Sequence, residues 1–255
     1  MDTDTPTPDM PTYQELVEQN KVLHEQLERM SANEMYIWST ILETSRKLQS
    51  SSASIKAAVS SLLSYDIFWD GANQHEFLMT INASIDQVSD LVRLIDIESR
   101  LSSGALEFRR EPHLLQEILT IVRVRLSQKE PNINLTIEFP EDGKLIDVDY
   151  AYLILALELF IQVIALRSQN SQIKIRAQQI GSQWKINFED IDTPLIDMIE
   201  KMVCCNFQPN GFSVMSAENI LKLHVAVEII SLQEFGFEFP QDHAGLTLVI
   251  NGTGQ

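Results

Sequence analysis

The sequence predicts an α+β protein: a long helical hairpin that forms a dimeric four-helix bundle, followed by an α/β sandwich. A seven-residue apolar repeat starts at Tyr13, and neither proline nor glycine interrupts it before Asp70, which is typical of coiled coils and bundles. From Ala105 onward, short alternating segments and amphipathic helices replace that repeat. With 255 residues, 44% of them apolar, the chain can bury a sizeable core.

These changes of pattern divide the chain into four parts: a disordered leader at 1–12, a coiled coil at 13–45, a dimerisation hairpin at 46–103 and the sandwich at 104–255. The leader is acidic and rich in proline. It has neither a basic segment nor an apolar run, so it does not match a signal peptide.

The long repeat predicts a homodimer. A helix of roughly 53 residues spans about 80 Å and cannot bury its apolar stripe inside a domain of this size. A second copy of the chain is the simplest partner. The polar positions Asn20 and Glu34 either fix the register of the seam or lean toward the surface. The expected interface comprises Leu16, Leu23, Leu27, Met30, Ile37, Ile41, Leu48, Ile55, Leu62, Ile81, Ile85, Val88 and Val92.

The remaining elements follow from local signals. Residues 70–73 predict a turn into the second helix, and Ser102-Ser103-Gly104 predicts the end of that helix. Alternation and helical spacing then predict strands at 105–109, 133–139, 145–148, 173–177, 184–188, 237–239 and 246–250, and helices at 113–128, 149–167, 195–203 and 217–235.

The composition excludes several classes of function. The formal net charge of −17 disfavours nucleic-acid binding and attraction to an anionic membrane. No apolar run is expected to approach the ~18 residues of a membrane span, so we expect a soluble protein. The only two cysteines, Cys204 and Cys205, are adjacent and poorly placed for a disulfide, which favours the cytoplasm.

Three segments carry a resemblance to a known family. They are 94–115, with Leu94-Ile95-Asp96-Ile97-Glu98-Ser99 and Pro112-His113-Leu114-Leu115, then Asp149-Tyr150-Ala151-Tyr152-Leu153, and Gly245-Leu246-Thr247-Leu248. Their order and spacing resemble the core of a sensor histidine kinase, in which a helical dimerisation hairpin precedes a Bergerat-type ATPase domain. The resemblance covers roughly 43–250 and implies that fold for this chain.

The same resemblance implies that the chemical groups of the family are missing. Arg46 stands where a kinase has its phospho-accepting histidine, and arginine is not nucleophilic at physiological pH. Leu159 and Val163 stand where two asparagines hold Mg²⁺ and the phosphates, and neither offers an oxygen ligand. The neighbours Glu158 and Gln162 remain as shifted ligands, but an ordinary exposed charge is the expected role of Glu158.

Both glycine motifs of the family are also missing. Asp190-Ile191-Asp192-Thr193-Pro194 keeps the adenine-binding aspartate at Asp190 but replaces both glycines, and Ser216–His224 contains no glycine. We therefore expect a degenerate histidine kinase that is not an enzyme and has no catalytic residue, cofactor or metal.

The expected function is that of a cytoplasmic signalling scaffold that binds a protein partner without phosphorylating it. In the family, receiver domains of response regulators dock on the dimerisation bundle. Carried onto this chain, that partner surface comprises Ala53, Lys56, Ala57, Ser60, Asp86, Ser89, Asp90 and Arg93. The bland alternative is that these are ordinary solvated helix faces. A rival explanation for the small residues of Ser50–Ser61 is that they only permit tight packing inside the dimer.

Three other functions stay open. A nucleotide-sensing switch would use Asp190 and an altered pocket. A phosphotransfer relay would need His24 or His75, each of which is more simply a solvated helix residue. The third is a purely structural coiled-coil assembly protein.

Overall fold

The computed structural model describes residues 21, 44–62, 71–139, 145–168, 172–181, 183–189, 191–204, 215–239 and 245–251. The leader and nearly all of the predicted coiled coil lie outside these residues. The same holds for six of the predicted interface positions: Leu16, Leu23, Leu27, Met30, Ile37 and Ile41.

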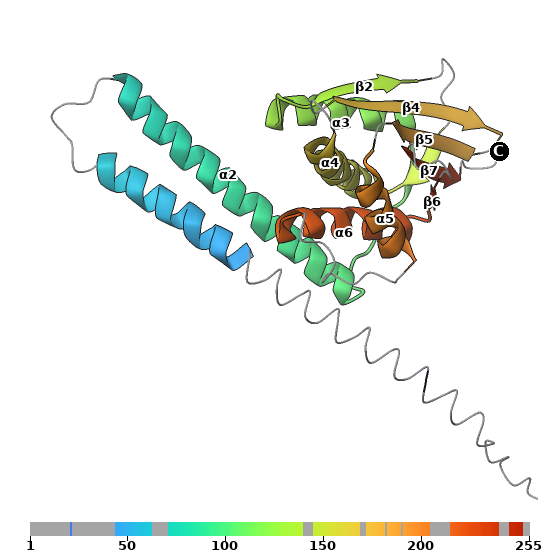
Figure 1. The fold of residues 1–255 in the computed structure, drawn as a ribbon, viewed down its shortest axis with the longest axis horizontal. Helices are drawn as coiled ribbons and strands as arrows, with labels where there is room; N and C mark the ends of the chain where they lie inside the picture. The colour runs from blue at the N-terminus through green and yellow to red at the C-terminus, as the bar shows by residue number, and fades with distance from the viewer. Residues whose placement is uncertain are drawn as a thin grey trace, which may run out of the picture.

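Two antiparallel helices form the hairpin: the first hairpin helix, residues 44–62, and α2, Gly71–Ser102 (Figure 1). The predicted turn at 70–73 is wrong for 71–73, because α2 begins at Gly71. Its predicted end is confirmed. Gly104 has a φ of 65°, and the N–H of Ala105 donates to the carbonyl of Arg100 at 2.9 Å. This is the glycine-ended helix terminus that the sequence indicates.

The two hairpin helices approach closely because small residues lie between them. Thr44, Ser51 and Ala58 are spaced seven apart and are buried, whereas Leu48 and Ile55 are half-buried. Ser51 Oγ donates a hydrogen bond to Gln87 Oε1 of α2 at 3.0 Å. Ser51 and Ala58 thus serve tight packing within the hairpin, whereas the rival explanation placed such packing inside the dimer.

The sandwich follows α2 (Figure 1). Its elements are β1 Glu111–Leu114, α3 Leu115–Lys129, β2 Asn134–Glu138, β3 Leu145–Val148, α4 Tyr150–Arg167, β4 Gln172–Ile180, β5 Gln183–Glu189, α5 Thr193–Val203, α6 Ala217–Leu232, β6 Gly236–Glu238 and β7 Gly245–Asn251. Five strands form one sheet in the order β2-β4-β5-β7-β6, in which β2 is parallel to β4 and the other neighbours are antiparallel. Strands β1 and β3 pair separately and antiparallel.

Most predicted elements are confirmed within a few residues, but the first strand is displaced. Residues 105–110 form no strand, and β1 lies at Glu111–Leu114, where it pairs with β3. Pro112 is tolerated there because a two-stranded sheet leaves each strand an open edge, where a missing N–H breaks no ladder. Because β1 takes up these residues, α3 begins at Leu115 rather than at His113.

Helix α6 also ends earlier than predicted, at Leu232 instead of Phe235. Glu234 takes a φ of 67°, and the N–H of Phe235 donates to the carbonyl of Ile230 at 3.2 Å. This is the same helix ending as at Gly104, built without a glycine. Because Glu234 stands at this position, no glycine marks the end of α6 there.

The inner face of the sheet packs against the helices. Buried side chains alternate along β4 and β5, with Ile173, Ile175, Trp184, Ile186 and Phe188 facing inward. Helices α4 and α6 contact each other and lie between the sheet and α2 (Figure 1). Leu94 and Ile97 of α2 belong to the same buried apolar cluster, so the end of the hairpin shares the core of the sandwich.

The outer face of the sheet carries charges instead. Glu138 of β2 accepts from Arg176 at 2.9 Å and pairs with Lys174 at 3.3 Å. Lys185 of β5 pairs with Glu238 of β6 at 2.6 Å. In these pairs a carboxylate on an edge strand meets a cation on an inner strand.

Helix α4 corrects one expectation. It is 18 residues long with a mean hydropathy of 1.7, so by length and composition alone it could cross a membrane, although no run of that length was expected. Most of it is buried inside the protein, as in the core helix of a soluble domain. This property is weak evidence for a membrane span.

Candidate functional site

Helix α4 is the element on which the resembling family holds its metal and phosphates. Asp149 caps this helix: its Oδ1 accepts from the N–H of Tyr152 at 3.1 Å. Leu159 is 8% exposed and Val163 is fully buried, and both belong to the apolar core. Two aliphatic side chains sealed in a core provide no donor or acceptor for a phosphate or a cation.

Glu158 does not have the expected role of an exposed helix charge. It is buried, with its Oε1 3.4 Å from the guanidinium of Arg125 on α3. Burial raises the pKa of Glu158, and the charges of Arg125, Lys129 and Arg93 only partly oppose this effect. The carboxylate of Glu158 thus lies near three cations, Arg125 and Lys129 of α3 and Arg93 of α2.

The segment after β5 is fixed by an ion pair. Asp192 is the N-cap residue of α5, and its Oδ2 accepts from Nε and a terminal nitrogen of Arg167 at 2.9 and 2.6 Å. The pair joins the end of α4 to the start of α5, where the family motif has its first glycine. Pro194 lies in the first turn of α5. Asp190, on which the nucleotide-switch hypothesis depends, lies outside the described residues.

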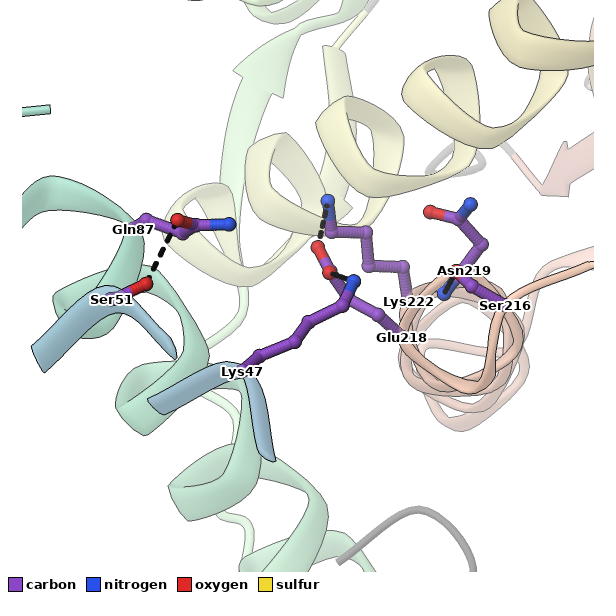
Figure 2. Close-up of polar contacts among 7 residues, drawn as sticks. All are labelled: Lys47, Ser51, Gln87, Ser216, Glu218, Asn219 and Lys222. Carbon is purple, nitrogen blue, oxygen red and sulfur yellow. Dashed lines mark hydrogen bonds and ion pairs between the residues drawn. The ribbon is translucent and has the colours of Figure 1, made fainter. Parts of the chain in front are cut away.

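The start of α6 is occupied by polar side chains that bind one another. Ser216 caps the helix, because its Oγ accepts from the N–H of Asn219 at 3.3 Å. Glu218 pairs with Lys222 at 2.8 Å and also with Lys47 of the first hairpin helix (Figure 2). The carboxylate of Glu218 thus stands where the family motif would bring glycine N–H groups to a phosphate.

All eight residues of the predicted partner surface are exposed. They do not lie at one level of the hairpin. Ser51 pairs with Gln87, so Ser60 lies about 13 Å from this level toward the helix connection and Arg93 about 9 Å from it in the opposite direction. Ala53, Asp86 and Ser89 lie within about 3 Å of this level, and a partner that covers the whole surface must span about 22 Å.

The α2 half of this surface also lies beside the sandwich. Lys129 at the end of α3 approaches Asp90 to 3.6 Å, and Arg93 contributes to the electrostatics of Glu158. A partner on Asp90 and Arg93 would therefore meet α3 as well as the hairpin.

The predicted interface residues of α2 share one face. Ile85 and Val92 are 47% and 53% exposed, Ile81 and Val88 are half-buried, and Leu78 is exposed beside them. On the first hairpin helix, Leu48, Ile55 and Leu62 are half-buried on the side of α2. Within the part of the chain that the structure describes, Ile85 and Val92 of this stripe are thus about half exposed.

The histidines and cysteines add one residue that the sequence analysis did not single out. His75 and Cys204 are exposed, while His24 and Cys205 lie outside the described residues. His224 of α6, however, pairs with Glu98 of α2, with 3.2 Å between Nδ1 and Oε2. No local pattern connects residues 126 positions apart, and only the packing of α6 on α2 brings them together.

No family model matches this sequence, and no curated protein matches it either. Solved structures do match the fold. The Acinetobacter baumannii histidine kinase AdeS is similar over 81% of this chain and 98% of that one, with a TM-score of 0.54 and 13% identity. Full-length ShkA, in complex with AMPPNP, is similar over 83% of this chain and 46% of that one, with a TM-score of 0.53 and 13% identity.

A third similar structure contains a partner. It is the histidine kinase ThkA in complex with the response regulator TrrA, similar over 96% of this chain and 68% of that one, with a TM-score of 0.51 and 17% identity. At these identities the likeness establishes the fold. The chain has a mixed α+β fold of the histidine-kinase type, as the resemblance in the sequence implied.

Proposed function

We propose that this chain is a catalytically inactive, histidine-kinase-like scaffold of the cytoplasm, which dimerises through its hairpin and binds a receiver-type protein without phosphorylating it. One observation carries the proposal: Leu159 and Val163 are sealed in the core of α4, at the positions where the family holds Mg²⁺ and phosphates. Arg46, exposed at the place of the phospho-acceptor, supports it.

The inactivity is tested by ligand binding. A ligand at 100 times its Kd stabilises a fold by about 2.7 kcal/mol, which a thermal-shift measurement detects readily. We expect no shift of Tm with ATP and Mg²⁺ at millimolar concentration, and no incorporation of labelled phosphate from ATP. A saturable shift that Asp190→Asn abolishes would favour the nucleotide switch instead.

The docking function is tested on the partner surface with a receiver domain that a pull-down recovers. Ala57 is exposed and small, so Ala57→Arg adds bulk and charge there without entering the core. We expect this variant to lose the receiver domain while its circular dichroism and size stay those of the wild type. The matched control is Ala151→Arg, at an exposed alanine of α4 in the sandwich. Equal capture by both variants would contradict docking on this surface.

A further inference from the structure

Three helices from distant parts of the chain meet at the base of the hairpin: the first hairpin helix, α2 and α6 (Figure 1). Glu218, in the first turn of α6, lies at this junction. Its Oε1 pairs with Lys222 one turn further on, at 2.8 Å, and its Oε2 pairs with Lys47 of the first hairpin helix (Figure 2). The two lysines hold different oxygens of one carboxylate, so Lys222 orients Glu218 toward Lys47.

This carboxylate is well suited to an ion pair that persists at neutral pH. Its side chain is only 15% exposed, whereas that of Lys47 is 32% exposed. Burial alone would raise the pKa of Glu218, but the hydrogen bonds from Lys222 and Lys47 outweigh burial and lower it. Glu218 therefore stays ionised throughout the neutral range.

The two hairpin helices are attached to the sandwich by different forces. Leu94 and Ile97 bury α2 in the apolar core that includes α6. The first hairpin helix packs on α2 through small buried residues such as Ser51 and Ala58. It contacts α6 directly through the ion pair of Lys47 with Glu218. Salt does not screen an apolar contact, but it screens a partly exposed ion pair, because the Debye length is about 8 Å at physiological ionic strength.

We propose that Lys47, Glu218 and Lys222 form a charged clasp that fixes the first hairpin helix to α6, and that ionic strength releases this clasp. Ala53, the nearest residue of the partner surface, lies six residues after Lys47, about 9 Å along the helix. The clasp therefore determines the position of Ala53, Lys56 and Ala57 relative to α3 and to the partner-surface residues of α2. Only this consequence rests on the proposed docking function, because the clasp itself is defined without any partner.

Hydrogen exchange tests the clasp on the intact chain. Lys47→Met keeps the apolar stem of the side chain and removes the charge. We expect amide exchange within 44–62 to rise about fivefold, in line with an ion pair of partly exposed groups. Exchange within α4 should be unchanged, which shows that the fold is intact. The matched control is Lys56→Met, at an exposed lysine of the same helix, which should leave exchange unchanged.

Two further measurements make the test decisive. The charge-swapped double variant Lys47→Glu with Glu218→Lys should recover most of the protection that Lys47→Met loses. Raising KCl to 0.5 M should increase exchange in 44–62 of the wild type and have no added effect on Lys47→Met. If Lys47→Met behaves like Lys56→Met, if the swap restores nothing, or if salt acts equally on both chains, the clasp is refuted. A chain that fails to bind receiver domains but passes these tests would refute the docking function alone.

Discussion

Helices α4 and α2 are both long, yet the chain treats their apolar residues in opposite ways. On α4 apolar residues surround the axis, and the sheet, α3 and α6 cover nearly all of them. On α2 the apolar residues form a stripe, of which Ile85 and Val92 remain about half exposed. A helix that is apolar all round is completed within its own domain, whereas a one-sided stripe that stays half exposed among the described residues is the feature on which the proposed dimer rests.

The two helices also differ in the residues on which the proposed function depends. At Leu159 and Val163, α4 has buried aliphatic side chains that belong to the apolar core. On α2, Ile85 and Val92 of the stripe are about half exposed. The buried aliphatic residues of α4 and the exposed stripe of α2 are the two observations behind the proposed scaffold.

The largest expected effect is that of placing an amide side chain at the buried position 163 of α4. Val163→Asn places two donors and an acceptor in a fully buried apolar site, so we expect the free energy of unfolding to fall by about 2–4 kcal/mol. Urea denaturation measures this loss. The control Gln162→Asn, at the half-buried neighbour, should cost less than about 1 kcal/mol. Equal stability of the two variants would mean that position 163 has polar partners and that α4 retains a site.

The next effect concerns the stripe on α2. Ile85→Asp puts a charge in the proposed dimer interface but at a residue that is exposed in the single chain, so the fold should survive while the dimer dissociates. We expect the dimer Kd to rise about 100-fold or more in light scattering. Ala83→Asp, exposed on the opposite face of α2, should leave the dimer intact. A wild-type chain that is monomeric at micromolar concentration would end the proposal of a dimer.

A smaller effect should follow pH at the contact between α2 and α6. Burial by itself lowers the pKa of His224, but the hydrogen bond and charge of Glu98 outweigh it and raise that pKa above the usual 6.5. Burial would raise the pKa of Glu98, yet His224 and Ser102 lower it below the usual 4.5.

The stabilisation from His224 is therefore complete below pH 6.5 and is lost as pH rises through its raised folded-state pKa. The stabilisation from Glu98 is lost only in acid. We expect His224→Gln to cost about 1 kcal/mol at pH 5.5 and less at pH 9, measured by urea denaturation. His75→Gln, at an exposed histidine of α2, should show no such dependence. A cost for His224→Gln that is the same at both pH values would contradict an ionic pair.

The smallest effect is expected at Glu158, the one acid buried in α4. Its raised pKa means that ionisation costs stability as pH rises, so Glu158→Gln removes that cost together with the pairing to Arg125. We expect a change within about 0.5 kcal/mol at pH 7, and a weaker decline of stability between pH 5 and 8 than in the wild type. Glu117→Gln, at an exposed acid of α3, serves as the control. A loss above 2 kcal/mol would show that the ion pair stabilises the core.

The sequence predicted the elements whose signals are local. The end of α2 follows from Gly104, and the burial of Leu159 and Val163 follows from a helix without a polar face. The position of β1 was missed because Glu111-Pro112-His113-Leu114 has little strand propensity and is ordered by its pairing with β3. Glu158 was misjudged, although an acid in an otherwise apolar helix already indicates a buried charge that needs a cation.

The site was less predictable than the fold, because its contacts join distant segments. Lys47 and Glu218 lie 171 positions apart, and no spacing rule relates them. His224 and Glu98 meet only after α6 packs on α2. The eight residues of the partner surface, four on each hairpin helix, were correctly predicted to be exposed. How far they spread along the hairpin became clear only from the pairing of Ser51 with Gln87.

The charges on the outer face of the sheet have a consequence for how copies of this chain meet in a crowded solution. A free sheet edge is a template for adding a strand from another molecule. Here each edge strand carries a carboxylate, Glu138 on β2 and Glu238 on β6, whose countercharges lie on inner strands of the same molecule. A strand added at either edge would therefore lie beside a row of paired charges rather than beside an apolar surface. The sheet thus offers another copy a poor template, in contrast to the uncharged stripe of α2 on which the proposed dimer depends.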